Sequence, residues 1–340
     1  MTIRVLHVLG DLTADDVVRR MLILVRRLGR DEFQHAALAI HGNDRAMSHC
    51  LTVLPTTRLH RHRFYHLLWP MQFRQSIKEY RPDVLHWWRA GPVGVVDRLL
   101  PWLISHCPTV LFDADLDASN RWDRWQYANC VRAGELHAAE PPRDGNAMVD
   151  LRQELGLDQH VRLIGVDEQL DLKGRLKDAI WVADLLKVLH DDVHLIIAGQ
   201  GALRWQLGRF RYQCHIEDRV HFVGSALGWN SQFVSQLNLW WSLGTRSLPS
   251  VALCEALTAG LPVIASDTPA HREVIEDGVN GILVPVGNRA NVARQSERLL
   301  QDQTIARQIG DDARHRAQST FAAAGAIDAY RQLYRELARR

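Results

Sequence analysis

The chain has 340 residues, enough for two domains of ordinary size, and its hydrophobic content of 46% is typical of a globular protein. Lys and Arg total 41 against 39 Asp and Glu, and the resulting net charge of +2 argues against a nucleic-acid-binding protein. Five scattered cysteines without a C-x-x-C pair argue against a disulfide framework and against a zinc site.

The first residues show no basic segment followed by an apolar stretch and a cleavage site, so no signal peptide is expected. No run reaches the roughly 18 apolar residues that a membrane-spanning helix requires. Both features predict a cytoplasmic protein. Clusters of Trp and Arg in the first half of the chain are compatible with a peripheral membrane contact.

Short apolar runs alternate with amphipathic segments through the first part of the chain. Strands are expected over 3–9, 36–40, 83–86 and 109–113, and helices over 17–28, 69–80 and 92–106. This alternation predicts parallel strands joined by right-handed crossovers, which is a doubly wound sheet.

The alternation is lost between residues 115 and 159. A segment rich in Pro and Gly over 140–145 is interpreted as a surface linker, which places a domain boundary near residue 145. The first domain, residues 1–145, is expected to be short, because its last strands cannot be placed before the linker.

A second alternating region begins at Val161. We expect strands over 161–166, 193–198, 220–223, 263–266 and 282–284, an apolar segment over 237–242, and helices over 177–189, 250–259, 290–300, 305–319 and 322–340. These elements predict a second α/β domain over 146–320. Two open α/β domains joined by a linker would face a cleft between the carboxyl ends of their strands, where such sheets bind ligands.

Residues 247–266 read as a loop, a helix and a buried strand. Ser250 is a suitable N-cap, and the free N–H groups at the helix start form an anion site. Glu255, one to two turns inside, can accept hydrogen bonds from a ribose diol. The alternative is a capped surface helix with a solvated Glu255.

Residues 247–266 resemble the signature of the family 4 glycosyltransferases, which have the GT-B fold and retain anomeric configuration. The similarity continues through 267–285, reaches back through 196–201 and 218–224, and covers about residues 160–320. The resemblance implies two Rossmann-like domains, of which the second binds a nucleotide-diphosphate sugar and the first holds an acceptor. The helix within 321–340 would then cross back to the first domain.

The resemblance also implies the residues of the donor site. These are Lys173, Gly199, Gly201, Ser250, Val251 and Glu255. Lys173 is also a candidate catalytic residue, because negative charge develops on the diphosphate leaving group in the transition state. No metal and no cofactor are expected, since side chains can supply the positive charge.

Two positions depart from the family's motifs. The signature has two Glu separated by seven residues; Glu255 fits the second, but Ser247 stands at the first. The family's Arg-x4-Lys pair matches at Lys173, whereas Glu168 stands at the Arg position and would repel phosphate. Arg175 or Arg246 can take the place of the missing cation. The family's first-domain Gly-rich loop is also absent, because residues 10–16 stand there.

Two further features of the first half concern the acceptor and a metal. The segment 82–86 resembles the family's strand that ends in His near the acceptor, so His86 is a tentative catalytic residue that orients or binds an acceptor hydroxyl. The alternative is a structural histidine. Asp113 and Asp115 have the spacing of a metal-binding Asp-x-Asp motif, but they end a first-domain strand, and no metal site is predicted.

The leading hypothesis is a retaining, metal-independent hexosyltransferase that moves a sugar from a nucleotide-sugar donor to a saccharide, lipid-linked or other acceptor. The alternative is a catalytically impaired or non-catalytic GT-B relative that acts as a nucleotide-binding or partner module, which the changes at Glu168 and Ser247 support. A nicotinamide-dependent oxidoreductase is disfavoured, because no G-x-G-x-x-G follows either leading strand. A periplasmic two-lobed binding protein is disfavoured by the absent signal peptide.

Overall fold

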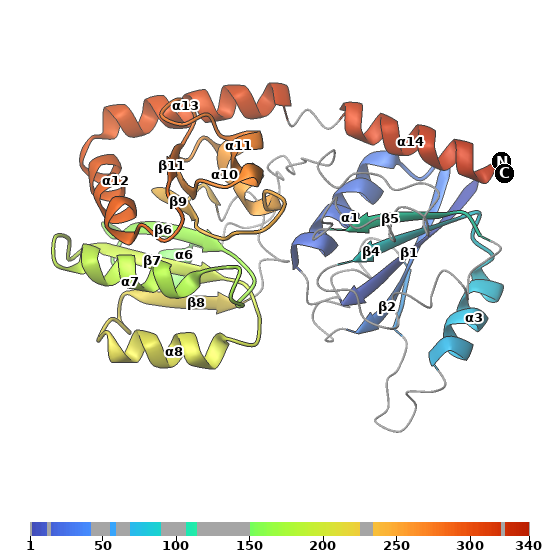
Figure 1. The fold of residues 1–340 in the computed structure, drawn as a ribbon, viewed down its shortest axis with the longest axis horizontal. Helices are drawn as coiled ribbons and strands as arrows, with labels where there is room; N and C mark the ends of the chain where they lie inside the picture. Colours follow the sequence, from blue (N-terminus) through green and yellow to red (C-terminus); the bar gives the residue numbers. More distant parts are fainter. Residues whose placement is uncertain are drawn as a thin grey trace. The chain divides into compact units, whose positions relative to one another are not determined.

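The computed structural model describes residues 2–11, 15–41, 55–58, 69–89, 107–113, 150–224, 234–320 and 324–339. The expected helix over 92–106, the linker over 140–145 and Asp115 lie outside these residues. The chain divides into two compact units (Figure 1). Unit 1 comprises Met1–Leu136 and Ala323–Arg340, and unit 2 comprises His137–Ala322. No helix in the described ranges is long and apolar enough to cross a membrane.

Unit 1 is built on a five-stranded parallel sheet in the order β3-β2-β1-β4-β5. Its strands are β1 (Ile3–Asp11), β2 (Phe33–His41), β3 (Thr56–Arg58), β4 (Val84–Arg89) and β5 (Thr109–Asp113), and its helices are α1 (Asp15–Leu28), α3 (Trp69–Tyr80) and α14 (Ala324–Ala338). β1 lies in the middle, so the chain winds outward in both directions as predicted. The three-residue β3 was not expected, because it is too short to show an alternating pattern.

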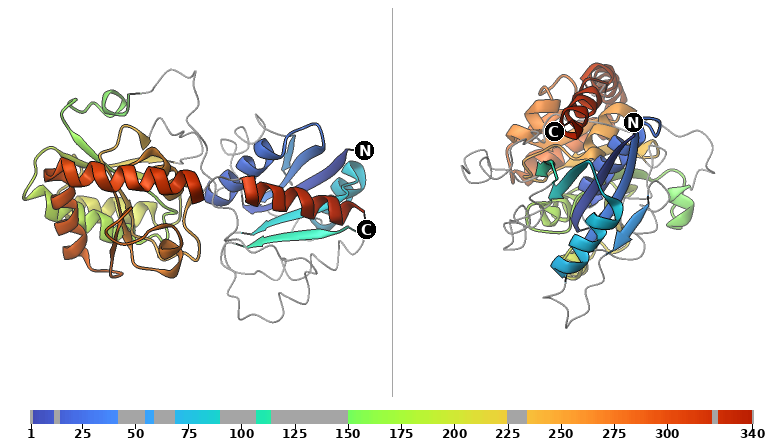
Figure 2. Two further views of the ribbon diagram at one scale, coloured as in Figure 1. Left: turned by 90° about the horizontal axis from the view of Figure 1, so that it is seen from above. Right: turned by 90° about the vertical axis from the view of Figure 1, so that its right-hand side faces the viewer.

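The last helix, α14, belongs to unit 1 although unit 2 precedes it in the sequence. It packs against β1, β4 and α1, and Figure 2 shows it lying along the sheet of this unit. Ile327, Tyr330, Tyr334 and Leu337 are buried, at the spacing of one helix face. Trp87 and Trp88 of β4 are buried as well, so these two do not contribute to an exposed Trp cluster.

Unit 2 is built on a six-stranded parallel sheet in the order β11-β10-β9-β6-β7-β8. Its strands are β6 (Arg162–Asp167), β7 (Val193–Ala198), β8 (Val220–Gly224), β9 (Leu239–Ser242), β10 (Val263–Ser266) and β11 (Ile282–Val284). Its helices are α6 (Leu151–Glu154), α7 (Leu176–Lys187), α8 (Arg204–Gln213), α10 (Val251–Ala259), α11 (Pro269–Val274), α12 (Arg289–Gln301) and α13 (Gln303–Thr320). The predicted doubly wound α/β architecture is therefore confirmed for both units.

Two apolar cores cover the two faces of the unit 2 sheet. Ile164, Ile197 and Trp241 belong to one core, whereas their neighbours in the chain, Ile196 and Trp240, belong to the other. Successive strand residues point to opposite faces, so burial on both faces explains the continuous apolar runs of these strands. Helix α8 was not predicted from the sequence. Leu207 is its one buried side chain, so the segment shows no apolar periodicity.

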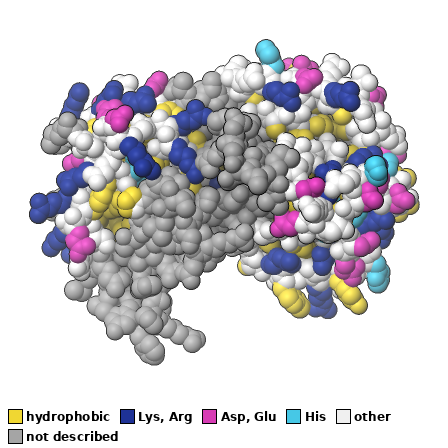
Figure 3. All heavy atoms as spheres, turned by 180° about the vertical axis from the view of Figure 1, so that it is seen from behind, with side chains coloured by type: hydrophobic (Ala, Val, Ile, Leu, Met, Phe, Trp, Pro, Cys, Tyr) yellow, Lys and Arg dark blue, Asp and Glu magenta, His cyan; other side chains and the backbone are white. Residues whose placement is uncertain are grey.

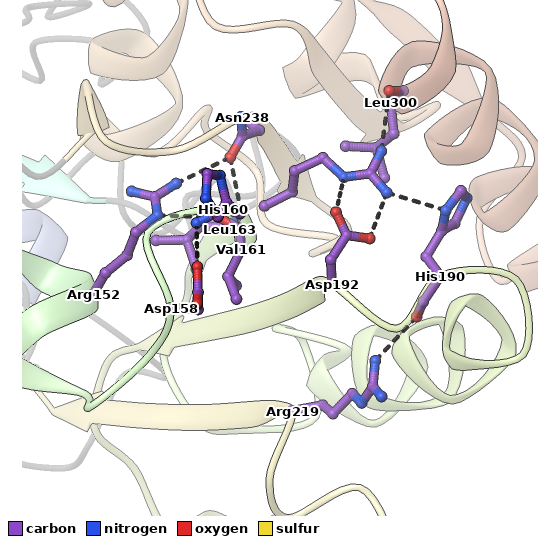
Figure 4. A network of polar contacts seen from close by, with 11 residues as sticks. Arg152, Asp158, His160, Val161, Leu163, His190, Asp192, Arg219, Asn238 and Leu300 are labelled. Carbon is purple, nitrogen blue, oxygen red and sulfur yellow. Dashed lines mark hydrogen bonds and ion pairs between the residues drawn. The ribbon is translucent and has the colours of Figure 1, made fainter.

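A polar network joins elements at the amino ends of β6 and β7 (Figure 4). Arg162 donates from Nε and Nη2 to the two carboxylate oxygens of Asp192, each at 2.6 Å, and from Nη1 to the Leu300 carbonyl at 3.1 Å. Asn238 Oδ1 accepts from the Leu163 amide at 2.8 Å. These bonds hold the amino edge of the sheet together, so the opposite, carboxyl edge is the place to look for a ligand.

Candidate donor site

Three loops meet at the carboxyl edge of the unit 2 sheet. They follow β6, β7 and β9 and are called here the carboxyl-edge loops: residues 168–175, 199–201 and 243–250. The Leu170 amide donates to the Gln200 carbonyl at 2.9 Å, and the Thr245 amide donates to the Lys173 carbonyl at 2.9 Å. The first loop is therefore bonded to each of the other two, which brings most of the predicted donor residues into one region.

Glycines permit this close approach. Gly199 has φ +120°, and a Cβ there would lie 2.0 Å from the Glu168 carbonyl oxygen. A Cβ at Gly201 would lie 2.4 Å from the Leu170 carbonyl oxygen, and one at Gly244 would lie 2.4 Å from Glu168 Oε1. Side chains at these positions would push the loops apart, which explains why the sequence has Gly here.

Glu168 is buried and forms an ion pair with Arg246. Arg246 Nε donates to Glu168 Oε2 at 3.1 Å, and its Nη2 donates to Asp171 Oδ1 at 2.9 Å. Burial lowers the pKa of the Arg246 guanidinium, but the Glu168 and Asp171 carboxylates outweigh it, so the pKa is raised above its ordinary value. The guanidinium of Arg246 therefore lies opposite the carboxylate that occupies the motif's Arg position.

The structure separates the two candidate replacement cations. Arg246 reaches the motif position occupied by Glu168, whereas Arg175 forms an ion pair with Asp178, which also accepts from Arg289 Nε at 2.6 Å. Ser247 directly follows Arg246 and is exposed.

Lys173 and α10 complete the carboxyl edge. The Lys173 side chain is exposed, as contact with a ligand requires. Ser250 Oγ accepts from the Leu253 amide at 3.1 Å, which confirms Ser250 as the N-cap of α10. Val251 and Glu255 are both buried in this helix. The alternative of a surface helix with a solvated Glu255 is therefore wrong.

A second polar cluster at the ends of β9 and β10 was not expected from the sequence. His271 Nδ1 lies 2.6 Å from the Ser266 carbonyl, and Nε2 lies 3.0 Å from Ser242 Oγ. Because a carbonyl only accepts, Nδ1 carries the proton and Nε2 accepts from Ser242. Burial lowers the pKa of His271, which favours this neutral form. The cluster ties both strand ends to α11.

His86 lies inside unit 1. β4 continues to Arg89, so the expectation that the strand ends at His86 is wrong. The imidazole is fully buried, and its Nδ1 lies 2.5 Å from Tyr334 Oη of α14. Burial lowers the pKa of His86 well below 6.5. These contacts agree with the structural alternative, in which His86 supports the packing of α14.

Metal-binding side chains are not grouped in the described part of the chain. No three His, Cys, Asp or Glu residues come together there as ligands of one ion. Asp113 is the last residue of β5, and its partner in the Asp-x-Asp spacing falls outside the described residues.

Comparison with known proteins points in one direction. Residues 148–316 match a family model described as "Glycosyl transferases group 1". The chain is 26% identical over 192 residues to N-acetyl-alpha-D-glucosaminyl L-malate synthase of Bacillus anthracis, covering 56% of this chain and 50% of that protein. It is 28% identical over 195 residues to alpha-D-kanosaminyltransferase of Streptomyces kanamyceticus, covering 55% of this chain and 49% of that protein. The chain spans about half the length of the curated relatives it matches.

Solved structures resemble the chain over nearly its whole length. Anabaena Alr3699/HepE in complex with UDP-glucose has a TM-score of 0.73 at 15% identity, covering 98% of this chain and 99% of that one. Sucrose-phosphate synthase from Thermosynechococcus elongatus has a TM-score of 0.71 at 15% identity, with the same coverage. At this identity the likeness shows the fold, which is the GT-B fold of two Rossmann-like domains.

Proposed function

Because residues 148–316 belong to the group 1 glycosyl transferase family, we propose that this chain transfers a sugar from a nucleotide-diphosphate sugar to an acceptor. The observation that carries the proposal is the meeting of the carboxyl-edge loops, which join Lys173 and Arg246 in the region that leads into α10. Cations and N–H dipoles stabilise the negative charge that develops on a diphosphate leaving group.

Each donor residue has a role in this proposal. The exposed Lys173 ammonium contacts the diphosphate, and Ser250 and Val251 offer it the amino end of α10. Gly199 and Gly201 shape the donor site by letting the second carboxyl-edge loop lie against the first, and Glu255 accepts hydrogen bonds from the ribose. Side chains supply the positive charge, so the proposed transfer needs neither a metal nor a cofactor. It is of the retaining, family 4 type, and the sugar is a hexose.

The first test donors follow from the comparisons. HepE, which shares the fold, is described in complex with UDP-glucose, so uridine diphosphate sugars come first. Unit 1 is proposed to hold the acceptor, a saccharide or a lipid-linked molecule. The cytoplasmic location and the peripheral membrane contact that the sequence predicts belong to the same proposal.

A second candidate function is a non-catalytic relative that retains nucleotide binding. The observation that favours it is the pairing of Arg246 with two carboxylates, Glu168 and Asp171. A guanidinium held in this way offers less net positive charge to a diphosphate than one without acidic neighbours. Ser247, at the position of the family's first Glu, points in the same direction.

The test of donor binding is thermal unfolding with UDP-, GDP- and ADP-sugars, with NAD as the control ligand. A donor at about one hundred times its dissociation constant should stabilise the protein by about 2.7 kcal/mol. We expect Lys173→Ala to abolish this stabilisation, whereas Lys78→Ala, at an exposed position of α3, should leave it unchanged. A well-folded protein that no nucleotide sugar stabilises would contradict the proposed donor site.

Turnover separates the two candidates. Release of nucleoside diphosphate from the donor in the presence of an acceptor supports the transferase. Binding without turnover supports the non-catalytic relative. In that case the double variant Glu168→Arg/Ser247→Glu, which restores both motif residues, should produce turnover if these two positions limit the reaction.

A further inference from the structure

Exposed apolar side chains gather on two neighbouring helices of unit 2. We call this group the α7–α8 surface; its members are Trp181, Leu185, Val188, Leu189, Trp205 and Tyr212. Large side chains in water are ordinary when they are scattered, but a contiguous group marks an interaction site. Applied to ordinary residue areas, the exposed fractions of the six residues amount to about 800 Å², which is what each partner contributes to a standard protein interface.

The two helices hold this surface in a defined arrangement. The rings of Trp181 of α7 and Phe210 of α8 are stacked with their centroids 6.2 Å apart. Lys187 Nζ at the end of α7 donates to the Cys214 carbonyl at the end of α8, at 3.2 Å. Leu207 is buried and anchors α8 to the core. The exposed side chains therefore project from a packed framework.

The exposed face of α8 carries a cation. Trp205, Arg209 and Tyr212 have the i, i+4, i+7 spacing of one helix face, and the Arg209 guanidinium lies 5.7 Å from the centre of the Trp205 ring. The other two arginines of α8 lie over the ring of Phe222, at 3.9 and 5.6 Å from its centre. Figure 3 shows hydrophobic and basic side chains projecting together at the lower right, where α8 lies.

The exposed face of α7 carries an anion. Asp184 lies three residues after Trp181, so the two share a helix face. The Asp184 carboxylate pairs with Lys187 at 3.0 Å, but its side chain is still 36% exposed. Lys177 Nζ lies 4.8 Å from the centre of the Phe210 ring, turned towards α8. An anion on one helix and a cation on its neighbour make the surface complementary to itself.

The balance of charge selects the partner. Residues 176–219 hold six Lys or Arg and six Asp or Glu, so the region lacks the positive excess that a nucleic acid or an anionic lipid would require. A second copy of this chain needs no such excess, because a two-fold axis brings each charge against the opposite one. An axis that runs between the two helices would lay α7 of each copy on α8 of the other.

The heights of the two charges along their helices suit this arrangement. Arg209 directly precedes Phe210, which stacks on Trp181, and Asp184 lies within one turn of Trp181. The rotation would therefore bring Arg209 of each copy towards Asp184 of the other, once on each side of the axis.

We propose that the α7–α8 surface joins two copies of this chain into a symmetric dimer, in which Arg209 of each copy pairs with Asp184 of the other. Trp205 and Tyr212 then pack on the apolar face of α7 and leave water. The proposal does not depend on sugar transfer, so it can hold or fail independently of the proposed function.

The test is the mass of the full chain in solution, measured by analytical ultracentrifugation over a range of concentrations. We expect twice the mass of the chain at high micromolar concentration and dissociation on dilution. Trp205→Ala/Tyr212→Ala should raise the dissociation constant at least about tenfold, because buried aromatic side chains carry much of the binding energy of an interface. Val279→Ala/Val286→Ala removes two side chains that are each 44% exposed elsewhere in unit 2, and it should leave the dissociation constant within about twofold of the wild type.

Mixed variants test the charged contact directly. Asp184→Arg and Arg209→Glu each place like charges across the axis, so each should weaken the dimer by at least about tenfold. In an equimolar mixture of the two variants, both contacts across the axis are again between opposite charges. A mixed dimer should therefore form at a concentration where either variant alone is monomeric. Arg307→Glu, at an exposed position of α13, should dimerise like the wild type.

Three results would overturn the proposal. The first is a chain that stays monomeric at high micromolar concentration, which would leave the surface to a different partner. The second is a dimer that the α7–α8 variants weaken no more than their controls, which would place the interface elsewhere. The third is the absence of a mixed dimer from Asp184→Arg and Arg209→Glu.

Two further measurements on the same variants keep these outcomes distinct. Circular dichroism should match the wild type, because every substituted side chain is at least partly exposed. Donor binding separates the interface from the proposed function, since a monomeric variant that still binds donor has lost the interface alone.

Discussion

Arg246 allows the carboxylate of Glu168 to remain buried. Its guanidinium supplies a charged hydrogen bond to Glu168 and another to Asp171, which also accepts from the Gly174 amide at 2.9 Å. An ionised carboxylate without a partner is costly in the protein interior, because it has lost its water. The pair therefore joins the first and third carboxyl-edge loops and positions the segment that carries Lys173.

Arg246→Ala should destabilise unit 2 by about 3 kcal/mol, because it leaves the Glu168 carboxylate buried without its guanidinium. Urea unfolding measures the loss. Glu168→Gln/Arg246→Ala should be more stable than Arg246→Ala alone, since the uncompensated charge is then absent.

The matched control is Arg272→Ala, which breaks the exposed ion pair of Arg272 with Asp267. Exposed pairs contribute less than about 1 kcal/mol, so this variant should unfold close to the wild type. Equal losses of unfolding free energy in Arg246→Ala and Arg272→Ala would contradict the importance of burial for the Glu168–Arg246 pair.

Three buried histidines form a second residue-scale feature, this time in unit 1. Trp88 Nε1 donates to His7 Nδ1 at 3.0 Å, and a Trp ring nitrogen only donates. His7 Nε2 therefore carries the proton and donates to His35 Nδ1, 3.0 Å away. Burial lowers the pKa of His35 from 6.5 to about 4 and lowers those of His7 and His86 well below 6.5. The folded unit thus holds all three rings neutral.

Acid should destabilise unit 1 through this cluster. Between pH 6.5 and 4 the unfolded chain binds protons that the folded unit does not. The contribution of these histidines to the free energy of unfolding is therefore complete above pH 6.5 and is lost as the pH drops. The pKa of His35 alone accounts for about 3 kcal/mol at pH 4. Calorimetry over this range measures the slope.

His35→Asn keeps an acceptor for the His7 N–H but cannot take up a proton in this range, so it should flatten the pH dependence. His160→Asn, at an exposed position of unit 2, should leave the slope unchanged. A slope that His35→Asn does not alter would assign the acid sensitivity to other groups.

At the scale of elements, the turn after β7 determines how closely the first and second carboxyl-edge loops approach. Gly199 combines a left-handed φ of +120° with a backbone contact that admits no Cβ, since the Glu168 carbonyl oxygen would lie 2.0 Å away. The Gly199 amide also donates to the Gly224 carbonyl at 2.6 Å, which joins the ends of β7 and β8.

Gly199→Ala should cost at least about 2 kcal/mol, because it adds a steric clash to the conformational strain, and it should weaken donor binding by moving the loops apart. Thermal unfolding with and without donor measures both effects. Gly278→Ala is the control in the same unit: it has φ +75° but no atom within 4 Å of the added Cβ, so it should cost about 1 kcal/mol. A loss no larger for Gly199→Ala than for Gly278→Ala would contradict the importance of the close contact.

At the scale of the whole molecule, the chain leaves unit 1, builds unit 2 and returns to unit 1 as α14. This helix buries Ile327, Tyr330, Tyr334 and Leu337 against unit 1. Tyr334 also meets His86, a residue 248 positions earlier in the sequence. Unit 1 is therefore complete only when the last residues are present.

Deletion of residues 323–340 should remove apolar burial that contributes about 6 kcal/mol to stability, which is comparable with the stability of a small domain. Hydrogen exchange should rise in β1 and β4, which α14 covers, and stay unchanged in β7 of unit 2. A uniform rise in both units, or no rise in β1, would contradict the assignment of α14 to unit 1.

The sequence by itself determined the doubly wound architecture, the buried strands such as 193–198, and the Ser250 cap of α10. These features follow from local rules, because apolar periodicity and capping act between residues a few positions apart. Short β3 and solvent-facing α8 carry too little of that local pattern to be predicted.

Only the tertiary structure decided the partners of the polar groups. Glu168 and Arg246 are 78 residues apart, and His86 and Tyr334 are 248 apart, so no spacing rule connects them. A buried carboxylate or imidazole can repel a ligand, bind one or only stabilise the fold. Which of these it does depends on the group that lies opposite it in the folded chain. The sequence therefore determined which residues stand at the motif positions, and the fold determined which of them face each other, because charges interact across space and not along the chain.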